Sequence, residues 1–401
     1  MHVVRMRLKP DPHLCYVASF TIAMAVYLLG WSDLYPSLTI PLLGFLVATF
    51  IIHFWLSRRF QKRPAETSYP DPAKRSPVYI TAFIYVLWLA EFMYEGGVPL
   101  FKILLDIPYN YRLFGIPSLH VFVVTFSSFY TVYLFQLYLS RKSKLILLLY
   151  ALNLVAAVLI YSRAMLFFNL TSSLFLYLNY KGGFSIRQVL SAGATVIVLL
   201  FFFGVLGSLR VSRLAGEPYG NENFLATGRA TDAFKKSFIP AEYFWSYIYI
   251  SSPLANLQQN INLQTPDPPT IGNIAKLINS EILPDFASKR IQKLLNLTVQ
   301  TDSRIPGPFN VSTVYSRAYS YAGWTGLVLT AAFLLTFPIV FTRILPLSSR
   351  FFLPAGSILC TMYFFSVYDN TFRFTGLSLQ LAYPLLLYWV DRKYSRLPRV
   401  F

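Results

Sequence analysis

The sequence predicts an all-α polytopic membrane protein with about ten transmembrane helices and one large outer loop. Its composition is the first reason: 55% of the 401 residues are hydrophobic and only 13% are charged, whereas an ordinary soluble domain carries about 25% charge. The second reason is that the apolar residues gather in runs near the ~20 residues that span a bilayer as a helix. The third is that Lys and Arg concentrate in alternate connections. These observations exclude a cytosolic enzyme.

Ten apolar runs mark the expected spans in order along the chain. They cover roughly 13–31, 37–57, 78–94, 119–139, 145–161, 164–180, 188–207, 320–342, 351–368 and 373–390. The fifth and sixth runs lie between Leu145 and Tyr180, where Arg163 is the only charged residue. A single helix over these 36 residues would be about 54 Å long, but the hydrocarbon core is only about 30 Å thick. The chain must therefore fold back near Arg163.

The distribution of basic residues predicts the orientation. Twenty Lys and Arg fall in one set of connections, and four fall in the short connections of the other set, namely Lys102, Arg112, Arg163 and Arg373. The basic-rich side is expected in the cytoplasm, with both termini. Orientation and anionic lipid then explain most of the net charge of +18, so membrane lipid is an expected partner and nucleic acid is not. The first apolar run is expected to be a retained span rather than a signal peptide.

The predicted spans divide the chain into three parts. These are an N-terminal membrane bundle of seven spans at 1–207, a large outer loop at 208–319 and a C-terminal membrane bundle of three spans at 320–401. The loop contains eleven Lys and Arg, which does not contradict the orientation because long segments cross regardless of charge. Within it, "IGNIAKLINSEIL" and "DFASKRIQKLLNL" place apolar residues at helical spacing. We expect two short amphipathic helices there, on the outer membrane surface.

Several catalytic signatures are missing from the sequence. There is no Walker-type glycine loop, no His-Glu-x-x-His segment and no pair of acidic residues separated by one position. Cys15 and Cys360 both fall in apolar runs, which indicates neither a disulfide nor a thiolate metal site. Any chemistry is therefore expected to proceed without metal, ATP or another cofactor.

Ionisable residues near the outer face are the candidates for function. His120 is the only histidine expected on that side, Glu91 and Glu95 would share a helix face, and Arg163 lies at the hinge between two spans. Further outer arginines are Arg112, Arg210, Arg213, Arg229 and Arg317. Ionisable groups at membrane depth usually face a cavity, and arginines gathered at one depth suit phosphate oxygens. The alternative for each arginine is that it only reaches lipid phosphate. For the two glutamates, it is that they only pair with arginines.

The order of short motifs resembles the Wzy-type O-antigen polymerases. "EGGVPLF", "FGIPSLHVF" and the hinge "YSRAM" precede a large outer loop that contains "YIYISSPLANL" and ends in "FNVSTVYSRAYSYAGWTG". The resemblance covers about residues 80–330. Some relatives carry an arginine followed eleven positions later by glycine in outer loops, and no arginine here has that spacing. The candidate arginines are therefore assigned by position.

The resemblance implies a bacterial inner-membrane glycosyltransferase with a GT-C-like layout. Such enzymes polymerise oligosaccharide repeat units carried on undecaprenyl diphosphate, at the periplasmic face, in lipopolysaccharide biosynthesis. The resemblance further implies a Wzz-type chain-length regulator and a Wzx-type flippase as partners. Tyr94, Asn310, Tyr315 and Tyr321 are further candidates for sugar contacts, and the alternative for a tyrosine such as Tyr94 is that it belongs to the aromatic belt at the membrane interface.

The residues suggest a metal-independent mechanism. Cleaving the bond between a sugar and a diphosphate develops negative charge on the leaving group, and one donor aimed at such charge contributes about 3 kcal/mol. We assign this role to Arg163, with Arg210, Arg213, Arg317, Arg112 and Arg229 as candidate partners. His120 is the first candidate for the base that takes the proton of the acceptor hydroxyl. Glu95 is the rival base, because burial can raise a carboxyl pKa toward neutrality.

Three other functions remain open from the sequence. An O-antigen ligase, which transfers glycan to lipid A core, has a similar layout. A flippase would move lipid-linked sugar without forming a bond, but such transporters often show paired repeats and broken helices, and the sequence shows neither. A receptor-like or structural protein would use the 112-residue outer segment for a partner, but this does not explain Arg163.

Overall fold

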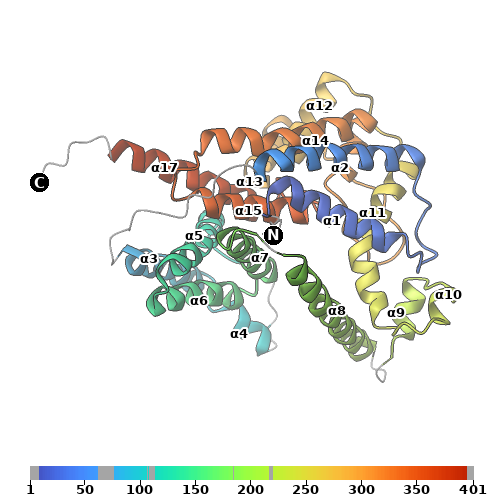
Figure 1. The fold of residues 1–401 in the computed structure, drawn as a ribbon, viewed down its shortest axis with the longest axis horizontal. Coiled ribbons are helices and arrows are strands. Elements are labelled where there is room, and N and C mark those ends of the chain that lie inside the picture. The colour runs from blue at the N-terminus through green and yellow to red at the C-terminus, as the bar shows by residue number, and fades with distance from the viewer. Residues whose placement is uncertain are drawn as a thin grey trace, which may run out of the picture.

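The computed structural model describes residues 9–61, 76–105, 107, 113–183, 185–215 and 220–394 (Figure 1). Within these residues the chain is helical and has no strand, apart from an isolated bridge between Ser32 and Ala230. The prediction of an all-α protein is confirmed. Arg112 lies outside the described residues.

The helices follow one another in the order printed on Figure 1. They are α1 Pro12–Tyr27, α2 Ile40–Gln61, α3 Ser76–Tyr94, α4 Pro99–Leu104, α5 Leu119–Arg141, α6 Lys144–Leu159, α7 Arg163–Tyr180, α8 Ile186–Ala215, α9 Glu222–Thr227, α10 Asp232–Lys235, α11 Tyr243–Leu263, α12 Ile271–Leu277, the π-helical turn η2 Ile278–Ile282, α13 Asp285–Leu295, α14 Ser316–Ile344, α15 Phe352–Phe365, α16 Thr375–Ser378, the 3₁₀ turn η3 Leu379–Leu381 and α17 Ala382–Tyr394.

Each of the ten predicted apolar runs contains a helix. Five helices are long and apolar enough to cross a membrane: Ile40–Phe60, Ser76–Tyr94, Leu119–Arg141, Leu190–Leu209 and Ser316–Ile344. Three shorter apolar helices are α1, α6 and α15, and a 16-residue helix such as α1 is about 24 Å long, shorter than the hydrocarbon core. The membrane character is thus supported, while the number of ten spans stays a prediction.

The tenth run differs from its prediction, because it does not form one helix. The chain passes through α16 and η3 before α17 begins at Ala382. Pro384 has no backbone N–H to donate to the carbonyl of Gln380, so a continuous α-helix would lose a hydrogen bond there. The break places residues 374–376 at the edge of the bundle, where they line a pocket described below.

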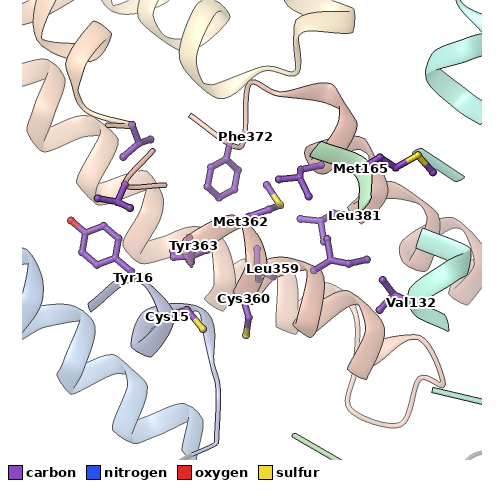
Figure 2. Close-up of a cluster of buried hydrophobic side chains, with 14 of the residues drawn as sticks. Cys15, Tyr16, Val132, Met165, Leu359, Cys360, Met362, Tyr363, Phe372 and Leu381 are labelled. Carbon is purple, nitrogen blue, oxygen red and sulfur yellow. The ribbon is translucent and has the colours of Figure 1, made fainter. Parts of the chain in front are cut away.

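Helix α15 forms the centre of the bundle. It packs against α1 on one side and against α5 and α7 on the other. Figure 2 shows Tyr363, Cys360 and Leu359 on this helix, with Tyr16 of α1 and Met165 of α7 on its two sides. Hydroxyl contacts such as that between Ser172 and Thr361, 2.8 Å apart, join the helices inside the bundle, as small polar residues do between membrane helices.

The outer loop contains one long helix that was not predicted from the sequence. Helix α11 packs against α1, α8 and α14, and it runs crosswise to α1 and α2 in Figure 1. Two buried amides connect it to the end of the loop: Asn256 donates to the carbonyls of Phe309 and Val311, at 2.8 and 2.7 Å, and Asn260 donates to the carbonyl of Ser316, at 2.8 Å. Polar residues of this kind are typical of a surface loop. Here they are buried, and their hydrogen bonds compensate the free-energy cost of burying them.

The two amphipathic helices predicted within the loop are confirmed as α12 and α13, with η2 continuing α12. Their location on a membrane surface stays a prediction. The "YAGWTG" motif interrupts α14, because Ala322 and Gly323 leave helical geometry and Gly323 has φ of 55°. A Cβ on Gly326 would lie 2.0 Å from the carbonyl oxygen of Ala318, so this position requires glycine.

Candidate functional site

The N-terminal ends of α5 and α7 form a pocket of about 570 Å³ with residues 374–376. We call it the His120–Arg163 pocket, because these two candidate residues both line it. Most of its remaining wall is apolar or weakly polar, from Phe114, Val121, Val124, Thr125, Ile160, Tyr161, Ser162, Ala164, Phe374, Thr375 and Gly376. The structure therefore brings together the two residues that the sequence analysis ranked first.

His120 is held by a buried carboxylate. Its Nδ1 lies 2.9 Å from Oε2 of Glu91, whose side chain is 0% exposed. The rings of Phe114 and Trp88 pack edge-on against the imidazole, with centroids 5.3 and 6.0 Å away. An ionised Glu91 only accepts hydrogen bonds, so the proton of a neutral imidazole resides on Nδ1 and Nε2 keeps its lone pair. The pair thus has the arrangement of a base oriented by an acid.

The sequence "EFMYE" positions both glutamates against the "FGIPSLH" segment. Glu91 contacts His120, and Oε1 of Glu95, four residues on, accepts the backbone N–H of Gly115 at 3.0 Å. Gly115 has φ of +104°, and a Cβ there would lie 2.5 Å from the imidazole. The prediction that the two glutamates share a face is confirmed. Glu95 holds the backbone near His120, whereas Glu91 holds the imidazole itself.

Arg163 is the first residue of α7, after the N-cap Ser162. Its guanidinium lies 5.9 Å from the ring centroid of Tyr161, and it forms no ion pair within the part of the chain that the structure describes. A cation at a helix N-terminus is unfavourable for the helix, because this end carries partial positive charge. The guanidinium and the helix end together favour an anion in the pocket.

A second pocket of about 480 Å³ lies beside the first and is strongly polar. We call it the Glu281 pocket. Its lining is Glu281, Asp302, Arg304, Asn310, Val311, Ser312, Thr313, Ser316, Arg317, Tyr368, Asp369, Asn370 and Arg373. Two of the predicted site residues, Arg317 and Asn310, belong to this pocket rather than to the one with Arg163.

Glu281 lies in the π-helical turn η2 and is 3% exposed. Its Oε2 accepts a hydrogen bond from Nδ2 of Asn370 at 3.0 Å. Its Oε1 makes no hydrogen bond in the described chain, although Nε of Arg317 lies 3.6 Å away. Burial raises the pKa of Glu281 to about 7, against the opposing effects of Arg317 and Asn370. Single π turns are frequent at functional sites.

The arginines of the Glu281 pocket differ in how they are paired. Asp302 binds Arg304 at 2.8 and 3.2 Å. Burial alone would raise the pKa of Asp302, but this arginine holds it below its usual range. Arg373 binds Asp285 at 2.8 Å. Arg317 has only loose contacts, 3.6 Å to Glu281 and 4.0 Å to Asp369.

One stretch of chain separates the two pockets. Arg373 lines the Glu281 pocket, and the next residue, Phe374, lines the other. Helix α13 holds this stretch, since the N–H of Asp285 donates to the carbonyl of Arg373 at 2.8 Å and the N–H of Phe286 donates to Oγ1 of Thr375 at 2.9 Å. The outer loop thus contributes to the boundary of both pockets.

Arg229 lines neither pocket, whereas the side chains of Arg210 and Arg213 are not described. Arg210 and Arg213 follow Gly207 in α8, which packs against Trp245 in the first turn of α11. Their side chains lie outside the described part. Arg229 is exposed, and its carbonyl accepts the N–H of Asp33 in the connection between α1 and α2.

The predicted tyrosines also line neither pocket. Tyr94 is 62% exposed on α3. Tyr315 is fully buried, with its hydroxyl 2.7 Å from that of Tyr16, and the buried Tyr321 accepts the N–H of Gln300. Both buried rings therefore belong to the helix packing, and only Asn310 of the four predicted sugar contacts lines a pocket.

Sequence reasoning missed Glu281 and the partnership of Glu91 with His120. Glu281 had a signal, because in "LINSEI" it follows Leu277 and Ile278 at helical spacing and so falls on the apolar face. No three His, Cys, Asp or Glu side chains of the described residues group to hold a metal ion. Comparison with known proteins finds no match to a family model, a curated protein or a solved structure.

Proposed function

We propose that this chain is a membrane glycosyltransferase that polymerises oligosaccharide repeat units carried on undecaprenyl diphosphate, at the periplasmic face of a bacterial inner membrane. The observation that supports this most is that Arg163 and the Glu91-held His120 line one pocket. A base and an unpaired cation facing one space suit transfer of a sugar from an anionic leaving group to a hydroxyl.

The His120–Arg163 pocket takes the diphosphate of the donor in this proposal. The guanidinium of Arg163 offers a two-pronged set of donors to the phosphate oxygens. Apolar wall residues such as Val121, Val124 and Ile160 suit the first isoprene units beside it. As the bond between the anomeric carbon and the diphosphate oxygen breaks, its electron pair stays on undecaprenyl diphosphate, where Arg163 stabilises the charge.

His120 acts on the acceptor. Its Nε2 takes the proton of the acceptor hydroxyl as that oxygen bonds to the anomeric carbon. The buried carboxylate of Glu91 stabilises the imidazolium that results. The energy comes from the diphosphate linkage, so no nucleotide is needed. A chain-length regulator and a flippase are the partners proposed from the resemblance.

Purified protein in lipid nanodiscs, supplied with lipid-linked repeat units from its host, tests the proposal. Wild-type protein should give a ladder of polymer without a flippase. Arg163→Ala should slow it by about 100-fold or more, since one donor to developing charge has that effect. Arg343→Ala is the matched control, because Arg343 is an exposed arginine in the last turn of α14, outside both pockets.

The same assay separates the alternatives. Polymer from Arg163→Ala at the wild-type rate would contradict the assignment of the leaving-group site. Transfer of glycan to lipid A core, with no extension of the lipid-linked unit, would identify a ligase. Movement of the lipid-linked unit across the membrane without any new glycosidic bond would identify a flippase.

A further inference from the structure

We propose that the Glu281 pocket binds an uncharged part of the saccharide, the acceptor end of the substrate, through Glu281 and Arg317. That this saccharide is the acceptor rests on the proposed function. The binding of saccharide itself rests on the geometry of the pocket.

Glu281 is a buried carboxylate with one oxygen that lacks a hydrogen bond in the described chain. Oε1 of Glu281 has no hydrogen-bond donor within the described residues, and the side chain is more than nine-tenths buried beside the pocket. A buried acceptor without a partner costs about 1–3 kcal/mol. A ligand that donates a hydrogen bond to Oε1 removes this cost.

The distance between Glu281 and Arg317 leaves both side chains able to bind a ligand. Their closest atoms are 3.6 Å apart, which is too long for a direct hydrogen bond. Arg317 makes no hydrogen bond to another described residue. A sugar hydroxyl both donates and accepts, so one hydroxyl can satisfy the carboxylate and the guanidinium together.

The charged side chains that line the Glu281 pocket balance one another. Arg304, Arg317 and Arg373 stand against Glu281, Asp302 and Asp369 in the lining, so the formal charges cancel. Two of the three arginines are also engaged at 2.8 Å by carboxylates. Such a pocket offers little net attraction to a diphosphate, in contrast to the pocket with the unpaired Arg163. It suits a neutral polyol that needs both donors and acceptors.

The Glu281 pocket lies next to the His120–Arg163 pocket. The two pockets meet along one stretch of chain, because Arg373 lines the Glu281 pocket and the next residue, Phe374, lines the His120–Arg163 pocket. A saccharide held at Glu281 can therefore extend past this stretch toward His120, where its terminal hydroxyl would meet the base. Tyr368 adds an aromatic surface to the wall on the Glu281 side.

Two ligands and three variants of the full chain in nanodiscs test this proposal by calorimetry. The first ligand is the free repeat-unit oligosaccharide, cleaved from its lipid and dephosphorylated, and the second is undecaprenyl phosphate. Glu281→Gln and Arg317→Lys should weaken oligosaccharide binding about tenfold or more and leave undecaprenyl phosphate binding unchanged. Arg163→Ala should weaken the binding of undecaprenyl phosphate and leave oligosaccharide binding unchanged.

Oligosaccharide binding that is equal in wild type and Glu281→Gln would overturn the proposal, as would a wild-type protein that does not bind the oligosaccharide. If Glu281→Gln loses both ligands through misfolding, Arg317→Lys decides by the same criterion. Failure of the proposed function would look different, because the protein would then make no polymer while its oligosaccharide binding still depended on Glu281.

Discussion

The two pockets on either side of the step from Arg373 to Phe374 are built in different ways. The His120–Arg163 pocket is mainly apolar, and its Arg163 has no carboxylate partner among the residues that the structure describes. The Glu281 pocket is polar, and its arginines face as many carboxylates. A carboxylate beside an arginine reduces the net attraction of that site for an added negative charge. This difference is the basis on which we propose that the first pocket holds the anionic part of a substrate and the second holds the neutral part.

The origin of the residues also differs between the pockets. The first pocket is built mainly from the ends of long helices, α5 and α7, with a short segment of the C-terminal bundle. The second combines a π turn, an irregular stretch at 302–313 and the connection after α15. Groups on helix ends are positioned by the bundle, whereas those of the second pocket are positioned by long-range hydrogen bonds such as that from Asn370 to Glu281.

The largest effect is expected at the base of the first pocket. His120→Ala should lower kcat by about 10²- to 10⁴-fold, the range of general base catalysis. Glu91→Gln should also lower kcat strongly with little change in KM, because an amide no longer fixes the tautomer or stabilises the imidazolium. The measurement is the rate of polymer formation in nanodiscs as a function of pH.

Glu95→Gln is the matched control, since it lies one helical turn from Glu91 and its Oε1 only accepts the N–H of Gly115. A glutamine oxygen can still accept that bond, so the rate should fall by no more than about threefold. A larger loss from Glu95→Gln than from Glu91→Gln would transfer the base role to Glu95.

The next effect concerns the backbone that supports His120. Gly115→Ala should lower the rate of polymer formation, and it should lower the free energy of unfolding by about 1–3 kcal/mol. The reason is that φ of +104° is strained for alanine and that its Cβ would clash with the imidazole of His120. Oligosaccharide binding at the Glu281 pocket should persist. Gly356→Ala in α15 is the control, as no atom lies within 4 Å of its added Cβ; a similar loss there would show a general effect of substituting glycine.

A pH-dependent effect is expected from the second pocket. The pKa of Glu281 rises from 4.5 to about 7 in the folded chain, so the folded state binds the proton more tightly than the unfolded state. The stabilisation is complete below about pH 4.5 and is lost as the pH rises through 7. The groups that face Glu281 are Arg317, Asn370, Asp369 and Asp285.

Thermal unfolding in detergent between pH 4.5 and 8 measures this contribution. The melting temperature of the wild type should fall with rising pH more steeply than that of Glu281→Gln, which cannot ionise. Equal slopes for the two proteins would show that Glu281 does not titrate in this range.

The smallest effect is expected for the arginines of α8. Arg210→Ala and Arg213→Ala should change the rate by less than about threefold, since their helix packs against the start of α11, whereas the Glu281 pocket lies near the end of this helix, where Asn260 binds Ser316. The two ends of α11, at Tyr243 and Leu263, are separated by 20 helical steps, or about 30 Å. A loss comparable to that of Arg163→Ala would place these side chains at the diphosphate after all.

The helices could be predicted well because their signal is local. A run of apolar residues predicts a helix without knowledge of its neighbours, and each of the ten runs contains one. Helix α11 was missed because its Ser, Asn and Gln side chains resemble those of a loop, and the partners of its buried Asn256 and Asn260 lie more than 40 residues away in sequence. The last run was predicted as one helix, because the pattern does not reveal the break before Pro384.

The candidate site was predicted in part. His120 and Arg163 stood out because each is an isolated ionisable group near an apolar run, and this isolation is visible in the sequence. Glu281 was overlooked although its spacing puts it on the apolar face of its segment, and only the structure shows that its carboxylate is buried.

The sequence by itself determined the helical class, the main helices, and the two ionisable residues of the first pocket, since these depend on composition and on spacing along the chain. Tertiary structure alone decided which charges are paired. An ion pair or a buried carboxylate depends on distances between segments far apart in sequence, as between Arg317 and Glu281. Among the residues that the structure describes, Arg163 forms no ion pair, while the arginines of the neighbouring pocket face carboxylates.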